Sequence, residues 1–271
     1  MATFSLTTWN INSVRLRLGL VERFLREHRP DVLLLQEIKC QDHQFPAETL
    51  AAAGYPYQAV RGQKGYHGVA IVSRHPLRDV ASTDWCGMGD ARHVEAIVDT
   101  PAGPPFDRVR LHDFYVPAGG DVADRNLNPK FAHKLDFVEE LAGLAHTRDG
   151  VPSILAGDLN IAPLEQDVWS HKQLLKVVSH TPVETEGLTR VIERQGWADV
   201  LRRAVPPEER LYTWWSYRSP DWDRADKGRR LDHIWASPEI ADRLEGIEVL
   251  REARGWEKPS DHAPVTATFR V

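Results

Sequence analysis

Apolar and polar positions alternate in short segments along the chain, which predicts β-strands separated by helices. Strands are predicted at residues 3–9, 32–35, 69–73, 93–99, 109–116, 153–156, 231–236, 246–250 and 265–270. A helix is predicted between Ser13, which can act as its N-cap, and Pro30, and a second over about 131–145. The pattern indicates an α/β or α+β protein with large mixed sheets.

The same pattern predicts one continuous domain over residues 1–271. No repeat, low-complexity tract or linker interrupts the chain, and the Pro/Gly-rich segment 101–105 is typical of a hairpin turn. We expect neither a signal peptide nor a membrane span. Cys40 and Cys86 lack metal-site spacing and are expected to be free thiols, although a disulfide between them stays open. We therefore expect a soluble, cytoplasmic protein.

Polar residues gather where the apolar strands end. They are Asn10 and Asn12, Glu37, Tyr115, and Asp158 and Asn160. In α/β folds, ligands bind at the carboxyl ends of strands. These polar side chains are therefore expected to converge on one cleft.

Glu37 and Asn10 are candidate metal ligands. A carboxylate and an amide oxygen suit a hard cation such as Mg²⁺, which commonly takes one or two carboxylates and keeps several waters. The alternative is that Glu37 is a solvated surface residue that only caps a loop. The residues themselves leave both interpretations open.

The GDLN segment, residues 157–160, and the KPSDHAPV segment, residues 258–265, carry candidate catalytic groups. Asp158 can take a proton from water, and Asn160 can donate to an oxygen that gains negative charge. His262 can contact a phosphate oxygen, with Asp232 placed to orient its ring. The alternatives are an Asx turn for Asp158 and Asn160 and a structural role for His262.

The charge balance argues weakly against a nucleic-acid partner, since 34 basic and 39 acidic residues give a formal net charge of −5. The segment 210–230 changes this picture, because it contains five aromatic and six basic residues against three acidic ones. Such interleaving suits base stacking and phosphate contact, although some of the tryptophans are expected in the core. Arg15 and Arg17 are further phosphate-binding candidates, with surface salt bridges as the alternative.

Together these residues resemble the exonuclease III family of apurinic/apyrimidinic endonucleases. The motifs that carry the resemblance are WNINSVR (9–15), LQEIK (35–39), GYHGVA (65–70), FYVP (114–117), GDLNIAP (157–163), TWWSYR (213–218), RRLDHIWAS (229–237) and EKPSDHAPVTATFR (257–270). Single motifs also occur in the broader superfamily of DNase I, sphingomyelinases and inositol polyphosphate phosphatases. The resemblance implies a four-layer α/β sandwich, in which two mixed β-sheets pack face to face with helices outside.

The resemblance also assigns roles to residues of this chain. It implies that Asn10 and Glu37 hold the metal, with Asp261 supporting the metal or the catalytic histidine. Tyr115 is expected to contact the scissile phosphate. The other expected roles are water activation by Asp158, oxyanion stabilisation by Asn160, phosphate contact by His262, orientation of His262 by Asp232, a wall of the sugar pocket by Trp214 and a DNA backbone contact by Arg92.

The reaction implied is Mg²⁺-dependent hydrolysis, with Mn²⁺ as an alternative ion, of the phosphodiester on the 5′ side of an abasic site. Related 3′-phosphatase and 3′→5′ exonuclease activities are also implied, with double-stranded DNA as substrate, a monomeric enzyme and no membrane partner. The main alternative is a phosphodiesterase of the same fold acting on lipid or inositol phosphates. A non-catalytic scaffold is a second alternative, which the intact set of polar residues at strand ends disfavours.

Two segments depart from the family pattern. Ala118 stands where an amide that bonds phosphate is expected, so that contact is missing or comes from elsewhere, for example from Asn128. Trp169 and His171 are bulkier than the residues expected after GDLNIAP. Our hypothesis is that they narrow the sugar pocket and shift the balance from abasic-site cleavage towards 3′-end processing.

Overall fold

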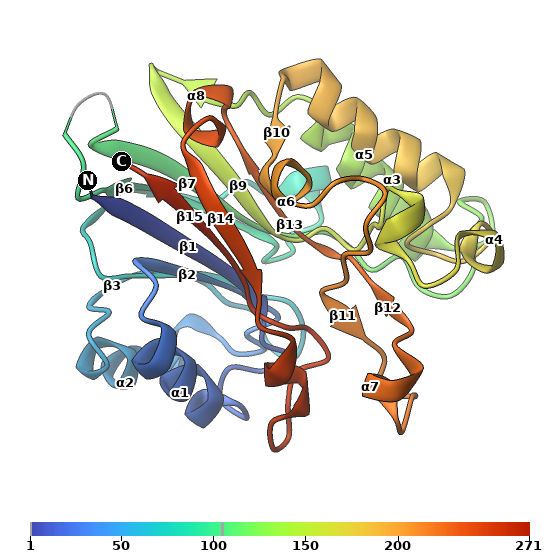
Figure 1. Cartoon of the computed structure of the whole chain (residues 1–271), viewed down its shortest axis with the longest axis horizontal. Coiled ribbons are helices and arrows are strands. Elements are labelled where there is room, and N and C mark those ends of the chain that lie inside the picture. Colours follow the sequence, from blue (N-terminus) through green and yellow to red (C-terminus); the bar gives the residue numbers. More distant parts are fainter. Residues whose placement is uncertain (1, 104–105) are drawn as a thin grey trace.

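Two β-sheets pack face to face in the computed structural model, which describes residues 2–103 and 106–271 (Figure 1). The first sheet has the order β14-β15-β1-β2-β4-β3, made of Leu244–Val249, Val265–Arg270, Thr3–Asn10, Val32–Gln36, Val69–Ser73 and Tyr57–Arg61. The second has the order β10-β13-β9-β7-β6-β5, made of Ala198–Asp199, Asp232–Ala236, Val151–Asp158, Arg108–Tyr115, His93–Asp99 and Leu77–Ala81, with β8 (Thr147–Arg148) beside β9.

Helices cover the outer face of each sheet, which confirms the predicted four-layer α/β sandwich (Figure 1). The first sheet is covered by α1 (Leu18–His28) and α2 (Ala47–Ala52), and the second by α3 (Pro129–Leu141) and α5 (Pro182–Gln195). The short remaining elements are η1 (Asp42–Gln44), η2 (Trp85–Gly87), η3 (Glu165–Asp167), α4 (His171–Leu174), α6 (Val200–Ala204), β11 (Trp214–Trp215), α7 (Trp222–Ala225), β12 (Gly228–Arg229), α8 (Pro238–Ala241) and η4 (Arg251–Gly255).

The main apolar core lies between the sheets. It takes alternate residues from both, such as Leu34 from β2 and Leu111 from β7. Two further apolar clusters join the outer faces to the helices: Phe24 of α1 packs against Trp9 of β1, and Phe137 of α3 packs over Phe114. Burial of both sheet faces explains why β2 (VLLLQ) and β4 (VAIVS) are almost continuously apolar.

The predicted start of the first helix is wrong. α1 begins at Leu18, and Ser13 is not its cap but has a positive φ of 87° in a preceding loop. The backbone N–H groups of Ser13 and Val14 donate to the carbonyls of Glu37 and Ile38, at 2.7 and 3.2 Å. These hydrogen bonds extend the pairing of β1 with β2 beyond the strand ends, so the helix begins only at Leu18.

The other predicted features agree more closely with the structure. β6 and β7 pair as an antiparallel hairpin, as segment 101–105 predicted, although residues 104–105 of its turn lie outside the described residues. The second predicted helix spans Pro129–Leu141. Cys40 and Cys86 are free thiols. Among the described residues, no helix has the length and apolar character needed to cross a membrane.

Candidate active site

The strand order brings the predicted polar residues to one edge of the sandwich. β1 and β2 run parallel and end together, so Asn10 lies beside the segment that leads to Glu37. β7 and β9 also run parallel, with Tyr115 opposite Asp158. Asp232 begins the antiparallel β13, again opposite Asp158. A cleft of about 840 Å³ opens at this edge, between these strand ends and the β11–β12 segment.

A continuous set of hydrogen bonds links the strand ends. Asn10 Nδ2 donates to Glu37 Oε1 and to Asp158 Oδ2, both at 2.9 Å. The Tyr115 hydroxyl donates to the same Glu37 oxygen at 2.9 Å. Burial raises the pKa of Tyr115, and the nearby charges of Glu37 and Asp158 raise it further, so the phenol stays protonated. The amide and the phenol thus fix both carboxylates at the base of the cleft.

His262 lies between two buried carboxylates. Its Nδ1 is 2.8 Å from Asp232 Oδ2 and its Nε2 is 3.7 Å from Asp158 Oδ2. Burial lowers the pKa of His262, but the charges of Asp232 and Asp158 outweigh burial and raise it to about 10. Burial raises the pKa of Asp158 to about 7, where Asp232 adds to the effect and His262 opposes it. His262 is therefore protonated, and its hydrogen bond to Asp232 holds the ring in place. Asp158 gains and loses its proton near neutral pH.

Asn160 is positioned by its backbone as well as its side chain. It has a positive φ of 54°, and its side-chain Nδ2 donates to the Val116 carbonyl at 3.0 Å and to Asp158 Oδ2 at 3.2 Å. The buried ammonium of Lys134 donates to the Asn160 carbonyl at 2.8 Å and pairs with Glu184 at 2.5 Å. Neither residue of this buried ion pair was predicted, because they come from different helices 50 positions apart.

Oxygen atoms suited to a hard cation gather around Glu37. Lys39 Nζ lies 2.8 Å from Glu37 Oε2 and 2.6 Å from Asn12 Oδ1, so a positive charge already rests between these two oxygens. Asp261 lies beside them, accepting from Asn12 Nδ2 at 3.2 Å and from Trp214 Nε1 at 2.9 Å. The carboxylate and amide donor set fits a divalent metal. Sequence reasoning missed Lys39 and gave Asn12 no role.

The predicted DNA-contacting residues divide between the cleft, the exposed surface and the protein interior. Trp214 lines the cleft, and Arg15 is exposed. Arg92 is buried, donates to Asp90 at 2.9 Å and stacks over the Tyr115 ring at 5.1 Å, so among the described residues its visible role is to hold Tyr115. Arg17 is also buried. It donates to the carbonyls of Asn12 and Lys258 and to the Tyr217 hydroxyl, which explains its position without a ligand.

The segment 210–230 divides between core and cleft, as its composition predicted. Tyr212 and Trp215 are buried in a small apolar cluster. Tyr217 and Arg218 line the cleft and are exposed. The segment therefore contributes both packing and a solvent-facing aromatic and basic wall.

The two departures from the family pattern are also resolved. Trp169 lines the cleft, with the Lys227 ammonium 4.7 Å from its ring centre. His171 does not line it: its Nδ1 bonds to His180 Nε2 at 2.8 Å, so the part of the hypothesis that concerns His171 is wrong. Asn128 caps α3 through Lys130 N, and its amide donates to the backbone of the neighbouring loop, so its polar atoms are already committed.

Residues 7–262 match the Endonuclease/Exonuclease/phosphatase family. The chain belongs to this family. It is 30% identical to exodeoxyribonuclease III of Haemophilus influenzae, over 97% of this chain and 98% of that protein. It superposes on an AP endonuclease from Archaeoglobus fulgidus with a TM-score of 0.89 and 32% identity, covering 99% and 100% of the two chains.

A second structural neighbour is NExo of Neisseria meningitidis, described as a 3′-5′ exonuclease. It has 34% identity, a TM-score of 0.85, and coverage of 99% and 100%. These relatives confirm the resemblance to the exonuclease III group that the motifs carried.

Proposed function

We propose that this chain is a metal-dependent DNA repair phosphodiesterase that incises double-stranded DNA on the 5′ side of abasic sites and processes 3′ ends. The observation that carries the proposal is the convergence of two carboxylate systems, Glu37 and Asp158–His262–Asp232, in one cleft beside Trp214. The named activities of the relatives, exodeoxyribonuclease III, AP endonuclease and 3′-5′ exonuclease, support it.

The metal that suits the donor set is Mg²⁺, with Mn²⁺ as a substitute. Glu37, Asn10 and Asp261 are the residues proposed to hold it, together with the side-chain oxygen of Asn12. When bound, the ion would neutralise charge on the scissile phosphate and stabilise the leaving oxygen. Burial alone would raise the pKa of Glu37, but Lys39 and Asn10 hold it below its usual value, so the carboxylate is ionised at neutral pH.

The chain's own groups supply the rest of the chemistry. Asp158, whose pKa burial raises to about 7, accepts a proton from the attacking water or orients it. His262, charged and fixed by Asp232, donates a hydrogen bond to a phosphate oxygen as negative charge develops. Asn160 and Tyr115 are further donors at the same edge of the cleft.

Trp169 is the residue we propose to set the balance between activities. Its ring lines the cleft next to Trp214, where it reduces the space for an extra-helical sugar. Trp169→Gly is expected to raise abasic-site cleavage relative to 3′-end processing, whereas His171→Gly is the matched control because His171 faces His180. An unchanged ratio in Trp169→Gly would remove this assignment.

The proposal is tested by supplying purified protein and Mg²⁺ with three duplexes: one with an abasic analogue, one undamaged with a recessed 3′ end, and one with a 3′-phosphate. Incision at the lesion that EDTA abolishes is the expected result. Activity at 3′ ends alone would restrict the function to end processing. Folded protein that cleaves none of them would overturn the proposal and direct attention to lipid and inositol phosphates.

A further inference from the structure

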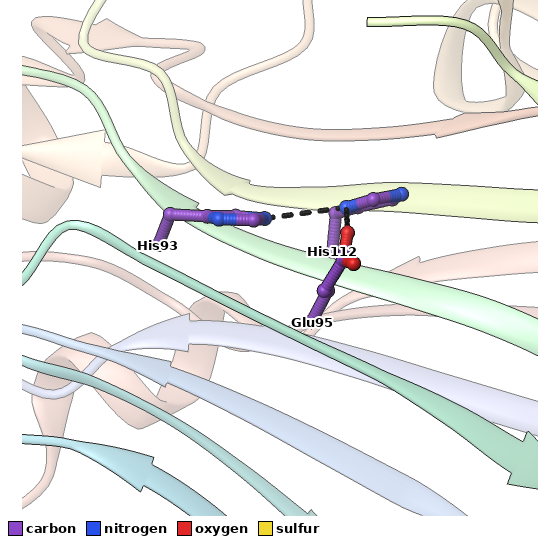
Figure 2. A group of neighbouring side chains, drawn as sticks. All are labelled: His93, Glu95 and His112. Carbon is purple, nitrogen blue, oxygen red and sulfur yellow. Dashed lines mark hydrogen bonds and ion pairs between the residues drawn. The ribbon is translucent and has the colours of Figure 1, made fainter. Parts of the chain in front are cut away.

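A second group of metal-ligand side chains lies outside the catalytic cleft, on the outer face of the second sheet. His93 and Glu95 are two positions apart on β6 and so share one face, and His112 on β7 is the register partner of Glu95. All three side chains are buried, and Figure 2 shows them pointing toward one another. Phe114 stacks on His93 at 4.4 Å, and Trp85 covers the ring edge-on at 5.9 Å.

Two of the three separations between the polar atoms match those of ligands around one ion, and all three atoms lie within 4.8 Å of one another. His93 Nε2 lies 3.2 Å from His112 Nδ1, which lies 3.1 Å from a Glu95 carboxylate oxygen, Oε2. Tetrahedral zinc with bonds of 2.0–2.1 Å places its ligand atoms about 3.3 Å apart. The side chains are therefore already close enough to converge on one small ion.

Hydrogen bonding alone cannot satisfy this group. Thr83 N–H donates to His93 Nδ1 at 3.2 Å, so a neutral His93 carries its proton on Nε2, facing His112. If His112 Nδ1 is bare, it accepts from His93 but meets the Glu95 carboxylate without a proton between them. If it is protonated, it donates to Glu95 but meets the N–H of His93. One of the two contacts is repulsive in either case.

The charge states suit a cation. Burial lowers the pKa of His93 to about 3 and also lowers that of His112, so both rings are neutral and offer lone pairs. Arg148 holds the other Glu95 oxygen, Oε1, at 2.6 Å and leaves Oε2 facing the histidines. Arg148 and Arg110 oppose an added positive charge, but Asp149 lies 3.9 and 4.0 Å from them and offsets part of this effect.

We propose that His93 Nε2, His112 Nδ1 and Glu95 Oε2 bind one structural Zn²⁺, with water as a fourth ligand. Two imidazoles and one carboxylate favour zinc over Mg²⁺, which prefers oxygen, so the site is chemically distinct from the catalytic one. The ion would cross-link β6 and β7 next to the buried Arg92, which precedes β6, and three residues before Tyr115, which lines the cleft at the end of β7. It therefore stiffens the backbone that holds Tyr115.

Zinc binding has a structural consequence at Thr83. An ion on His93 Nε2 leaves the ring proton on Nδ1, so the N–H of Thr83 must turn away from the ring. Thr83 is exposed and lies between β5 and η2, where water can accept that N–H. Zinc binding is thus expected to shift the NMR resonance of the Thr83 backbone amide.

The test measures zinc bound per protein after incubation with Zn²⁺ and dialysis against excess Mg²⁺, which competes at the catalytic site. One equivalent is expected in the wild type and in Glu37→Gln, and none in His112→Leu or Glu95→Gln. Zinc that persists in His112→Leu, is lost in Glu37→Gln, or is absent from the wild type would overturn the proposal.

A second measurement avoids dependence on the variants' folding. Crystals of the wild-type protein soaked in Zn²⁺ are measured at the zinc absorption edge. The proposal requires an anomalous peak about 2.0–2.2 Å from all three ligand atoms. A map with no peak between these side chains contradicts it, whatever the nuclease activity of the protein.

Discussion

Replacing Asp232 with asparagine tests how His262 acquires its charge. Asp232 Oδ2 accepts from His262 Nδ1 at 2.8 Å and from the Thr213 hydroxyl at 2.6 Å, whereas Oδ1 has no partner among the described residues. Asparagine can keep its amide oxygen at the position of Oδ2 and place its amide nitrogen at the position of Oδ1. The substitution thus removes a negative charge and preserves the shape of the site.

The size of the effect follows from the balance at His262. Burial lowers the pKa of His262, and the charge of Asp232 is the largest influence that raises it, to about 10. Loss of a neighbouring opposite charge shifts a pKa by about 1–3 units, equivalent to roughly 1.4–4 kcal/mol. Because His262 acts as a cation, activity is lost as pH rises through its pKa. The alkaline limb of kcat/KM should therefore move down by about 1–3 pH units.

The assay is kcat/KM for an abasic duplex between pH 6 and pH 10 with saturating Mg²⁺. The wild-type profile should rise near pH 7 as Asp158 loses its proton and stay high towards pH 10. Thr213→Val is the matched control, because it removes one hydrogen bond to Asp232 but keeps the carboxylate charge. An alkaline limb in Asp232→Asn that coincides with the wild type would refute the reasoning.

Three other predictions concern the metal, the fold and the DNA surface. Glu37→Gln should raise the Mg²⁺ concentration for half-maximal activity at least about tenfold, and an unchanged titration would count against its ligand role. Lys134→Met should lower the free energy of unfolding, measured by urea denaturation, by about 3–5 kcal/mol, since it leaves the buried Glu184 charge unpaired. The double variant Lys134→Met/Glu184→Gln removes that charge and should recover part of the lost stability. Lys227→Gln should lower the slope of log DNA affinity against log salt concentration by about 1, measured by fluorescence anisotropy. A slope equal to that of the wild type would show that Lys227 does not contact the DNA phosphates.

The sequence predicted the convergence of polar strand ends on one cleft, for a physical reason. An apolar run marks the buried part of a strand, so the polar residues that follow the run mark where the strand leaves the core. Asn10, Glu37, Tyr115 and Asp158 were identified in this way. Parallel pairing of β1 with β2 and of β7 with β9 then brings these ends together.

Long side chains and distant pairings were not predictable by the same reasoning. Arg17 was predicted to bind phosphate from its charge, and Arg92 to contact the DNA backbone from the family resemblance, but the structure turns both inward, to the loop carbonyls and to Asp90. Helix placement failed at Ser13 for a related reason, since contacts with the next strand end outweighed its capping propensity. A local sequence pattern does not show which partner an arginine side chain binds in the folded protein.

The most direct test of the proposed active site is the incision rate of an abasic duplex by Asp158→Asn relative to the wild type, under single-turnover conditions with Mg²⁺. Asparagine is nearly isosteric but cannot accept a proton, so the rate should fall by about 10²–10⁴ while DNA binding and the melting temperature stay close to wild type. A variant that cleaves at the wild-type rate would show that Asp158 is not the base, and the account of this cleft would have to be abandoned.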